Sequence, residues 1–209
     1  VMSDLTFYTN PMSRGRIARW MLEEVGVPYR TEILAFSTDM KSHAYKAINP
    51  MGKVPAIKHG DTIVTECAAI CAYLADAFPG ANLAPPTKQR GLYYRWLFFT
   101  AGPLEMAGSF KALGVEVPPD KYRMVGCGAY ADVMNTLELA VSENRFVAGD
   151  QFTAADVYVA SHIGWGMQVG TVEKRPHFVE YLSHISERPA FKRALQLDEE
   201  ASKDLQPTG

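Results

Sequence analysis

The sequence lacks cysteine pairs, an excess of one charge and any long apolar run. Its three cysteines, Cys67, Cys71 and Cys127, form no C-x-x-C pair, which argues against a disulfide framework and a zinc site. A net charge of −2 gives no electrostatic basis for nucleic-acid binding. No apolar run is long enough to span a membrane, and no secretory signal is expected. We therefore expect a protein of the reducing cytoplasm that contacts neither nucleic acid nor membrane.

The first third of the chain alternates between strand and helix patterns. Residues 5–8 form a short apolar run typical of a strand, and the apolar residues of 13–25 recur at helical spacing. Residues 29–33 alternate between polar and apolar side chains, which predicts a second strand. This βαβ order predicts that the two strands are parallel.

A second strand-rich stretch follows a polar one. Residues 37–46 are polar and predict a short helix and loop. The segments 54–58 and 62–65 flank His-Gly-Asp, which is a hairpin signal, and the apolar residues 66–78 then predict a buried helix. Residues 1–80 therefore predict one mixed sheet with helices.

The rest of the chain predicts helices only. The Pro- and Gly-rich residues 78–89 mark a domain boundary. We expect a long helix over 88–113, interrupted near Gly102–Pro103, and another over 120–143. The fold class is thus α/β followed by an all-helical domain, residues 88–209.

The motif Phe-Thr-Ala-Ala-Asp-Val at 152–157 is a strong helix start. Thr153 is the expected N-cap, and Asp156 takes the capping-box position. Pro176 and Pro189 each suit the first turn of a further helix.

Pro55 is unusual because it lies in the expected strand Lys53–Lys58. Proline removes a hydrogen-bond donor from a sheet and is normally confined to edges and bulges. A cis bond between Val54 and Pro55 would end the pairing and leave the N–H and C=O of Val54 free to bond an extended peptide. The alternative is that Pro55 merely lies on an edge strand.

Two helix starts strengthen the peptide-site interpretation. Glu66 precedes a helix N-terminus, which can hold a carboxylate, while its own side chain can pair with an ammonium group. Ser13 lies between a strand and a helix whose first turn carries Arg14 and Arg16, where the helix dipole disfavours cations. The alternatives are that Glu66 only complements the helix dipole and that Ser13 is an ordinary N-cap. All three features would lie at one end of the sheet, where ligands bind in open α/β folds.

Taken together, the segments 49–57 (NPMGKVPAI), 65–74 (TECAAICAYL) and 152–157 (FTAADV) resemble the cytosolic glutathione transferase superfamily of bacterial type. The resemblance spans nearly the whole chain. It implies a thioredoxin-like N-terminal domain, residues 1–80, a helical C-terminal domain and a homodimer. It also implies a cis bond before Pro55.

The resemblance implies how glutathione would bind. The backbone of Val54, ahead of Pro55, would meet the cysteinyl part, and Lys53 would approach the glycine carboxylate. Glu66 and Cys67 would hold the γ-glutamyl end. The family usually has serine where this chain has Cys67, and a thiol is the weaker donor.

The residue that activates the thiol is left open by the resemblance. The bacterial cysteine-type pattern places it at Ser13, whereas the serine-type patterns place it at Asn10. Thr9 is a third possibility, and Tyr8 lies too early in the strand. The loop contains no cysteine, which argues against disulfide exchange as the main activity.

The implied reaction is conjugation of the glutathione thiolate to a small hydrophobic electrophile, as in detoxification, with no metal. The expected electrophile pocket lies between the domains and includes Met12, Phe110, Leu113 and Trp165; the alternative is that these four are core residues. Other readings of the same fold are a glutathione-dependent peroxidase or reductase, and a non-enzymatic glutathione-binding or interaction protein.

Overall fold

The computed structural model describes residues 4–205 and divides into two compact units. The first unit combines the chain up to Asn82 with the chain from Glu187 onward, and the second is Leu83–Ser186. The sequence analysis assigned 88–209 to one helical domain. The last helix instead packs against the first helix, inside the first unit.

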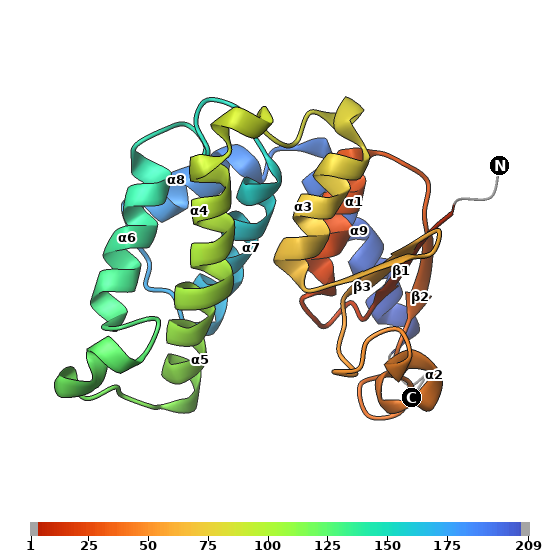
Figure 1. The fold of residues 1–209 in the computed structure, drawn as a ribbon, viewed down its shortest axis with the longest axis horizontal. Helices are drawn as coiled ribbons and strands as arrows, with labels where there is room; N and C mark the ends of the chain where they lie inside the picture. The colour runs from red at the N-terminus through yellow and green to blue at the C-terminus, as the bar shows by residue number, and fades with distance from the viewer. Residues whose placement is uncertain (1–3, 206–209) are drawn as a thin grey trace. The chain divides into compact units, whose positions relative to one another are not determined.

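The first unit is a four-stranded mixed sheet with helices (Figure 1). Its elements are β1 (Leu5–Thr9), α1 (Gly15–Val25), β2 (Arg30–Ile33), α2 (His43–Lys46), β3 (Ala56–His59), β4 (Thr62–Thr65), α3 (Cys67–Ala77) and α9 (Pro189–Asp204). The strand order is β2-β1-β3-β4. As predicted, β1 and β2 are parallel and β3 and β4 form a hairpin.

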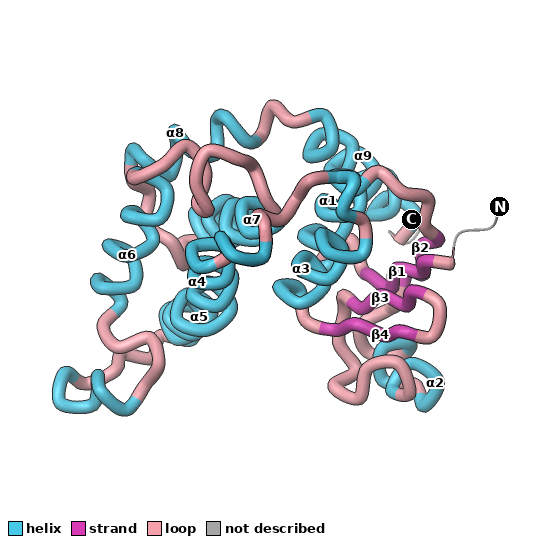
Figure 2. Tube along the Cα trace, turned by 45° about the horizontal axis from the view of Figure 1, so that its top comes forward, coloured by secondary structure: helices cyan, strands magenta, loops and turns pink. Residues whose placement is uncertain are grey.

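The two faces of the sheet carry different helices, with α1 and α3 on one side and α2 on the other (Figure 2). Side chains alternate along β1 between these faces. The guanidinium of Arg19 in α1 lies over the Phe7 ring, with its Cζ 5.0 Å from the ring centroid. Tyr8 points the other way, its ring 5.7 Å from that of Tyr45 in α2. Tyr8 therefore lies on the sheet face opposite α1.

Buried contacts hold α9 against α1. The Trp20 and Phe191 rings meet edge to face at 4.8 Å. Arg188 donates to both carboxylate oxygens of Glu24, each at 2.7 Å. This anchoring explains why a helix at the end of the chain belongs to the first unit.

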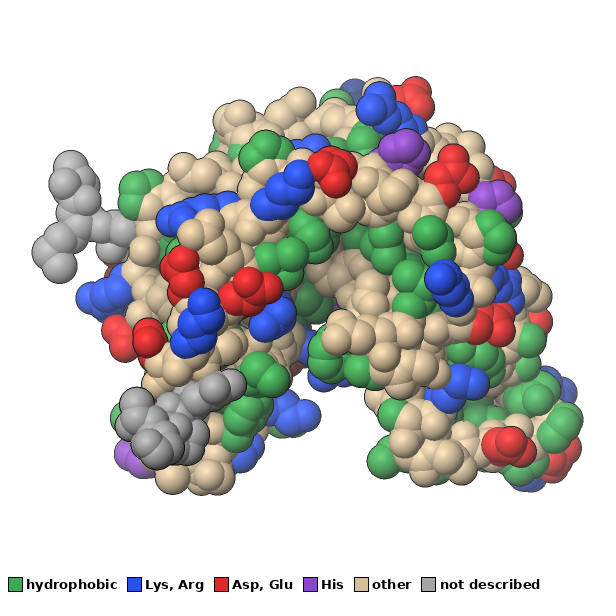
Figure 3. Space-filling model, turned by 180° about the vertical axis from the view of Figure 1, so that it is seen from behind, with side chains coloured by type: hydrophobic (Ala, Val, Ile, Leu, Met, Phe, Trp, Pro, Cys, Tyr) green, Lys and Arg blue, Asp and Glu red, His purple; other side chains and the backbone are tan. Residues whose placement is uncertain are grey.

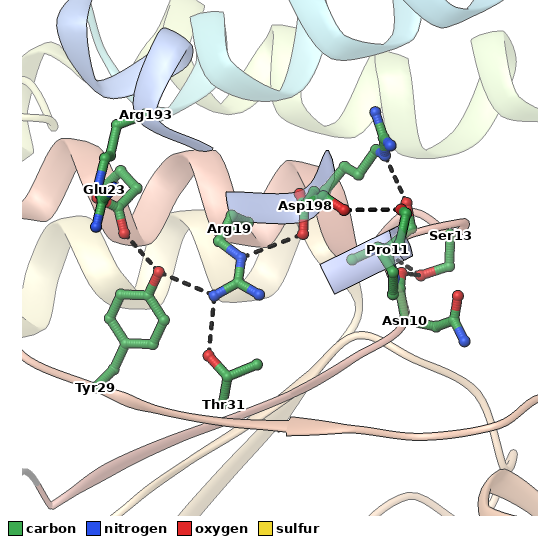
Figure 4. Close-up of polar contacts among 12 residues, drawn as sticks. Asn10, Pro11, Ser13, Arg19, Glu23, Tyr29, Thr31, Arg193 and Asp198 are labelled. Atoms are coloured by element: carbon green, nitrogen blue, oxygen red, sulfur yellow. Dashed lines mark hydrogen bonds and ion pairs between the residues drawn. The ribbon is translucent and has the colours of Figure 1, made fainter. Parts of the chain in front are cut away.

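A buried arginine joins α9 to the sheet as well (Figure 4). Arg19 Nε lies 3.2 Å from Asp198 Oδ1, and its Nη1 donates to Thr31 Oγ1 at 2.9 Å and to the Tyr29 hydroxyl at 3.1 Å. Tyr29 donates to Glu23, and burial is the main reason that the pKa of Tyr29 rises to about 12. Burial also raises the pKa of Asp198, although the charge and the hydrogen bond of Arg19 act to lower it.

The second unit consists of helices. They are α4 (Gly91–Phe99), α5 (Glu105–Leu113), α6 (Tyr130–Ser142), α7 (Ala154–Val169) and α8 (Pro176–Ile185). The predicted interruption near Gly102–Pro103 is a wider helical turn over Thr100–Leu104 that joins α4 to α5. The predicted helix over 120–143 is wrong in its first part, because α6 begins only at Tyr130 after Gly128 adopts a φ of 57°.

The predicted capping box at the start of α7 is confirmed. The buried Asp156 carboxylate accepts hydrogen bonds from the backbone N–H groups of Val147 (3.0 Å) and Thr153 (2.9 Å) and from the Tyr181 hydroxyl (2.7 Å). Burial raises the pKa of Asp156 to about 6, although each of these bonds favours the ionised form.

No helix within residues 4–205 is both long and apolar enough to cross a membrane. On the face shown in Figure 3, basic and acidic side chains are interspersed, in keeping with a net charge of −2.

Replacing Asp156 by alanine should destabilise the protein by about 3 kcal/mol or more, because buried donors at Val147, Thr153 and Tyr181 lose their acceptor. Urea unfolding followed by circular dichroism measures the loss. Ser161→Ala, which removes only a hydroxyl bonded within α7, is the control. Equal stability of the two variants would contradict the prediction.

Candidate functional site

Three segments of the first unit meet at one end of the sheet. Ala56, the first residue of β3, pairs with Tyr8 on one side and with Thr65 on the other. The loop after β1, the residues before β3 and the start of α3 are therefore neighbours. This is the juxtaposition that the sequence analysis expected.

The bond between Val54 and Pro55 is cis, as predicted. The strand begins only at Ala56, so the expectation that Pro55 lies inside a strand is wrong. The half-buried Val54 side chain packs on a small core that includes Met40 and Tyr45. Within residues 4–205, its backbone N–H and C=O take no part in the hydrogen bonds of turns, loops and caps.

The residues just before Val54 are tied down from the α2 side. The carbonyl oxygen of Lys53 accepts the Tyr45 hydroxyl at 2.7 Å and the Asn49 side-chain N–H at 2.8 Å. The Lys53 side chain itself is exposed.

Lys41 is a second cation at this segment, and the sequence analysis missed it. Its ammonium donates to the Gly52 carbonyl at 2.8 Å, and its side chain is exposed. Gly52 has a φ of 58°, and a Cβ there would lie 2.6 Å from the Met40 carbonyl oxygen, so only glycine fits. The position of Lys41 in a polar stretch was its only sequence signal.

Glu66 and Cys67 open α3. Glu66 is exposed and has a φ of 70°, a left-handed conformation that is rare and strained for a residue other than glycine. Cys67 is buried, and its Sγ donates to the Arg14 carbonyl at 3.5 Å. That contact joins the start of α3 to the start of α1.

Asn10 is a structural residue in the loop after β1 (Figure 4). It is only 4% exposed. Its Nδ2 donates to the Leu34 carbonyl and its Oδ1 accepts the Met12 N–H, both at 2.9 Å. Both ends of the amide therefore hold the loop, which leaves little of the side chain for a ligand.

Ser13 is half-buried and lies where α1 begins. Its hydroxyl donates to the Asn10 carbonyl at 2.6 Å and accepts the Gly15 N–H at 2.9 Å. The helix starts at Gly15 and its N-cap is Arg14, so the alternative that Ser13 is an ordinary N-cap is wrong, although its hydroxyl accepts the first helical N–H. Arg16 turns its Nε to the Pro11 carbonyl at 2.5 Å, which ties its guanidinium to the loop.

Thr9 and Tyr8 are poorly placed for contact with a thiol. Thr9 is fully buried, and its Oγ1 would lie 1.9 Å from a Cβ added to Gly15, so the hydroxyl is packed against the helix. Tyr8 lies on the opposite sheet face, against Tyr45.

The residues expected in the electrophile pocket fall on both units. Met12 belongs to the first unit and is 70% exposed, whereas Leu113 (75% exposed) and Trp165 (61%) belong to the second. The alternative that these residues are core is therefore wrong. Phe110, in α5, is half-buried. Among residues 4–205, no group of three or more His, Cys, Asp and Glu side chains could hold a metal ion.

Comparison with known proteins gives two family matches. One is the glutathione S-transferase N-terminal domain, over residues 12–77, and the other is its C-terminal domain, over residues 117–189. Together they cover more than half of the chain. The expected fold class, a thioredoxin-like domain followed by a helical one, is confirmed.

Individual proteins agree with these matches. Glutathione S-transferase GstA of Escherichia coli O157:H7 is 29% identical over 158 residues, which are 74% of this chain and 78% of that protein. Glutathione S-transferase 3 of Zea mays is 28% identical and covers 93% of this chain and 94% of its own length. The structure of a sphingomonad glutathione S-transferase complexed with glutathione is 25% identical with a TM-score of 0.74, and the match covers 93% of this chain and 98% of that one.

Asn10→Ala should destabilise the protein by about 2 kcal/mol, because the Leu34 carbonyl and the Met12 N–H lose a buried partner. Thermal unfolding without ligand measures the effect. Asn144→Ala, at an exposed position, should leave stability unchanged. An Asn10→Ala protein as stable as the wild type would show that the amide does not hold the loop.

Proposed function

Because the chain belongs to the glutathione S-transferase superfamily, we propose that it joins the thiolate of glutathione to small hydrophobic electrophiles. The observation that carries the proposal is the backbone of Val54, outside the local hydrogen-bond pattern ahead of a cis-proline and beside the starts of two helices. An extended peptide can pair with such a backbone by strand addition.

The surrounding charges match the two ends of glutathione. The ammonium groups of Lys41 and Lys53 suit the glycine carboxylate. The start of α3 offers backbone N–H groups for the γ-glutamyl carboxylate, and the exposed Glu66 carboxylate suits the ammonium beside it. The strained backbone of Glu66 supports a role in binding, since such strain is concentrated at functional sites.

The reaction needs a thiolate. The S–H proton leaves, the sulfur lone pair attacks an electrophilic carbon, and a leaving group or a neighbouring atom takes the electron pair. A free thiol has a pKa of about 8.5, so lowering it by about two units needs about 2.7 kcal/mol. One hydrogen bond to the thiolate contributes roughly 1.5–3 kcal/mol and a helix N-terminus roughly 0.3–1 kcal/mol, which together suffice.

Ser13 is the best candidate for that hydrogen bond. Its hydroxyl is half-buried, and it can rotate away from the Asn10 carbonyl because that oxygen also accepts the Ser13 N–H at 3.1 Å. The Asn10 side chain would have to break its two hydrogen bonds within the loop to reach a thiolate. The Thr9 hydroxyl is packed against Gly15. The α1 N-terminus adds its partial positive charge to the same place.

The second substrate and the oligomer are further parts of the proposal. Met12, Phe110, Leu113 and Trp165 are apolar and accessible, which suits a hydrophobic electrophile. On α4, the rings of Tyr94 and Phe98 lie 6.4 Å apart and are 43% and 71% exposed, a surface that a homodimer would cover.

The cellular setting and the competing activities complete the proposal. Free buried cysteines suit a cytoplasmic protein of detoxification.

Conjugation of an aryl halide that exceeds peroxide turnover would separate transferase from peroxidase, and retention on glutathione-agarose without either activity would indicate a binding protein.

Ser13→Ala should raise the pH midpoint of conjugation by about one to two pH units and lower turnover at neutral pH, because the thiolate loses a hydrogen bond. Glutathione affinity should persist. The measurement is kcat against pH with an aryl halide, and Ser37→Ala, at an exposed position, is the control. An unchanged midpoint would reassign the role to Asn10 or to backbone N–H groups.

Glu66→Ala should weaken glutathione binding about tenfold and change kcat little, since the carboxylate would contact the glutamyl ammonium rather than the sulfur. Calorimetric titration gives the affinity. Asp61→Ala removes another exposed carboxylate from the same unit and should bind normally. Equal affinities in the two variants would remove Glu66 from the site.

A further inference from the structure

The carbonyl oxygen of Lys53 is held by two buried side chains. Tyr45 and Asn49, both about 4% exposed, donate to it at 2.7 and 2.8 Å. Both donors come from the α2 region, on the sheet face opposite α1. Two side-chain donors fill both lone pairs of this loop carbonyl and so fix its direction.

The geometry of the peptide bond turns this contact into a constraint on Val54. The Lys53 C=O and the Val54 N–H belong to one planar trans peptide, so they point in opposite directions. Holding the oxygen towards Tyr45 and Asn49 therefore aims the Val54 N–H away from them. That N–H belongs to the backbone expected to meet the peptide ligand.

The two donors are themselves fixed. The Tyr45 backbone N–H is capped by the Ser42 hydroxyl at 3.1 Å, and the Tyr45 ring packs against Tyr8. Asn49 Oδ1 accepts the Met51 N–H at 3.1 Å, so its amide is orientated by both ends. Neither side chain can follow the carbonyl if the segment moves.

We infer that Tyr45 and Asn49 are positioning residues for glutathione, which act through the Lys53 carbonyl to hold the Val54 N–H in the orientation that the tripeptide requires. The inference rests on the proposed function. It assigns part of the affinity for glutathione to two side chains of the α2 region that touch no ligand atom.

A positioning role of this kind predicts a specific kinetic signature. The affected N–H would meet the peptide part of glutathione, whereas the Ser13 hydroxyl would act on the sulfur. Burial raises the pKa of Tyr45 to about 12, so its hydroxyl stays a neutral donor over the whole working pH range. Removing it should therefore raise KM and leave both kcat and the pH midpoint in place.

The test is Tyr45→Phe, which removes one hydroxyl and keeps the ring. The Kd and KM for glutathione should rise about fivefold, because the Val54 N–H is no longer held in its binding orientation, with kcat and the pH midpoint unchanged. Without glutathione, amide hydrogen exchange in a peptide spanning Gly52–Ala56 should become faster. Tyr73→Phe is the matched control, because it removes a hydroxyl bonded to His59 in the same unit and should change neither quantity.

A double-mutant cycle with Asn49→Ala extends the test. Either donor alone would still hold the oxygen in part, so the loss of both should weaken binding by more than the product of the single effects. Additive effects would show that the two residues act independently and would overturn their joint role. Tyr45→Phe carries the test by itself should the Asn49 variant not fold.

The outcomes separate this inference from the proposed function. A wild-type chain that binds no glutathione overturns the proposed function. A wild type that binds, with Tyr45→Phe unchanged in either Kd or amide exchange, overturns this inference alone. A fall in melting temperature with unchanged Kd would assign Tyr45 a merely structural role and would also overturn it.

Discussion

The pairing of Ala56 with two strands at once is the constraint on which the site depends. Its partners are Tyr8, one residue before the end of β1, and Thr65, the last residue of β4. A shift of β3 by one residue would exchange Ala56 and Ile57 between two buried faces of the sheet, which the different sizes of these side chains disfavour. The register therefore brings the Ser13 loop, Val54 and Glu66 together.

Around this edge, the polar side chains differ in how firmly hydrogen bonds within the protein hold them. Three side chains donate hydrogen bonds to backbone carbonyls: Asn10, Tyr45 and Asn49. Moving any of them towards a ligand would break that bond and leave a buried polar group unpaired. Ser13 differs because a hydroxyl can rotate while its oxygen still accepts the Gly15 N–H. The family resemblance left Asn10 and Ser13 both open, and this difference in hydrogen bonding is why the proposed mechanism assigns the thiol to Ser13.

Much of the fold could be predicted because its signals are local. Alternation and helical spacing predicted the βαβ unit, and Thr153 with Asp156 predicted the start of α7, since each depends on residues close in sequence. The position of Pro55 left a cis bond and an edge-strand proline both open, and the family resemblance implied the cis bond that the structure has, although the strand begins after it.

The remainder depends on contacts between residues far apart in the chain. The sequence gives no sign that Asp198 meets Arg19 or that Phe191 meets Trp20, and so α9 was expected in the wrong unit. The helix predicted over 120–143 begins too early, because Gly128 takes a φ of 57° and α6 starts only at Tyr130. Lys41 was missed because only the fold brings it to Gly52.

The start of α3 shows how the framework can compensate for a weaker side chain. The thiol of Cys67 is buried and already directed at the Arg14 carbonyl, so it offers little to a ligand where a hydroxyl would offer a donor. The backbone N–H groups that begin α3 are unaffected by this exchange, because they belong to the helix. Glu66 holds a left-handed conformation just before them, and its strain persists only because the β4–α3 turn is held between Ala56 and the start of α1. We therefore infer that recognition of the γ-glutamyl end depends here on the geometry of that turn more than on the side chain at position 67.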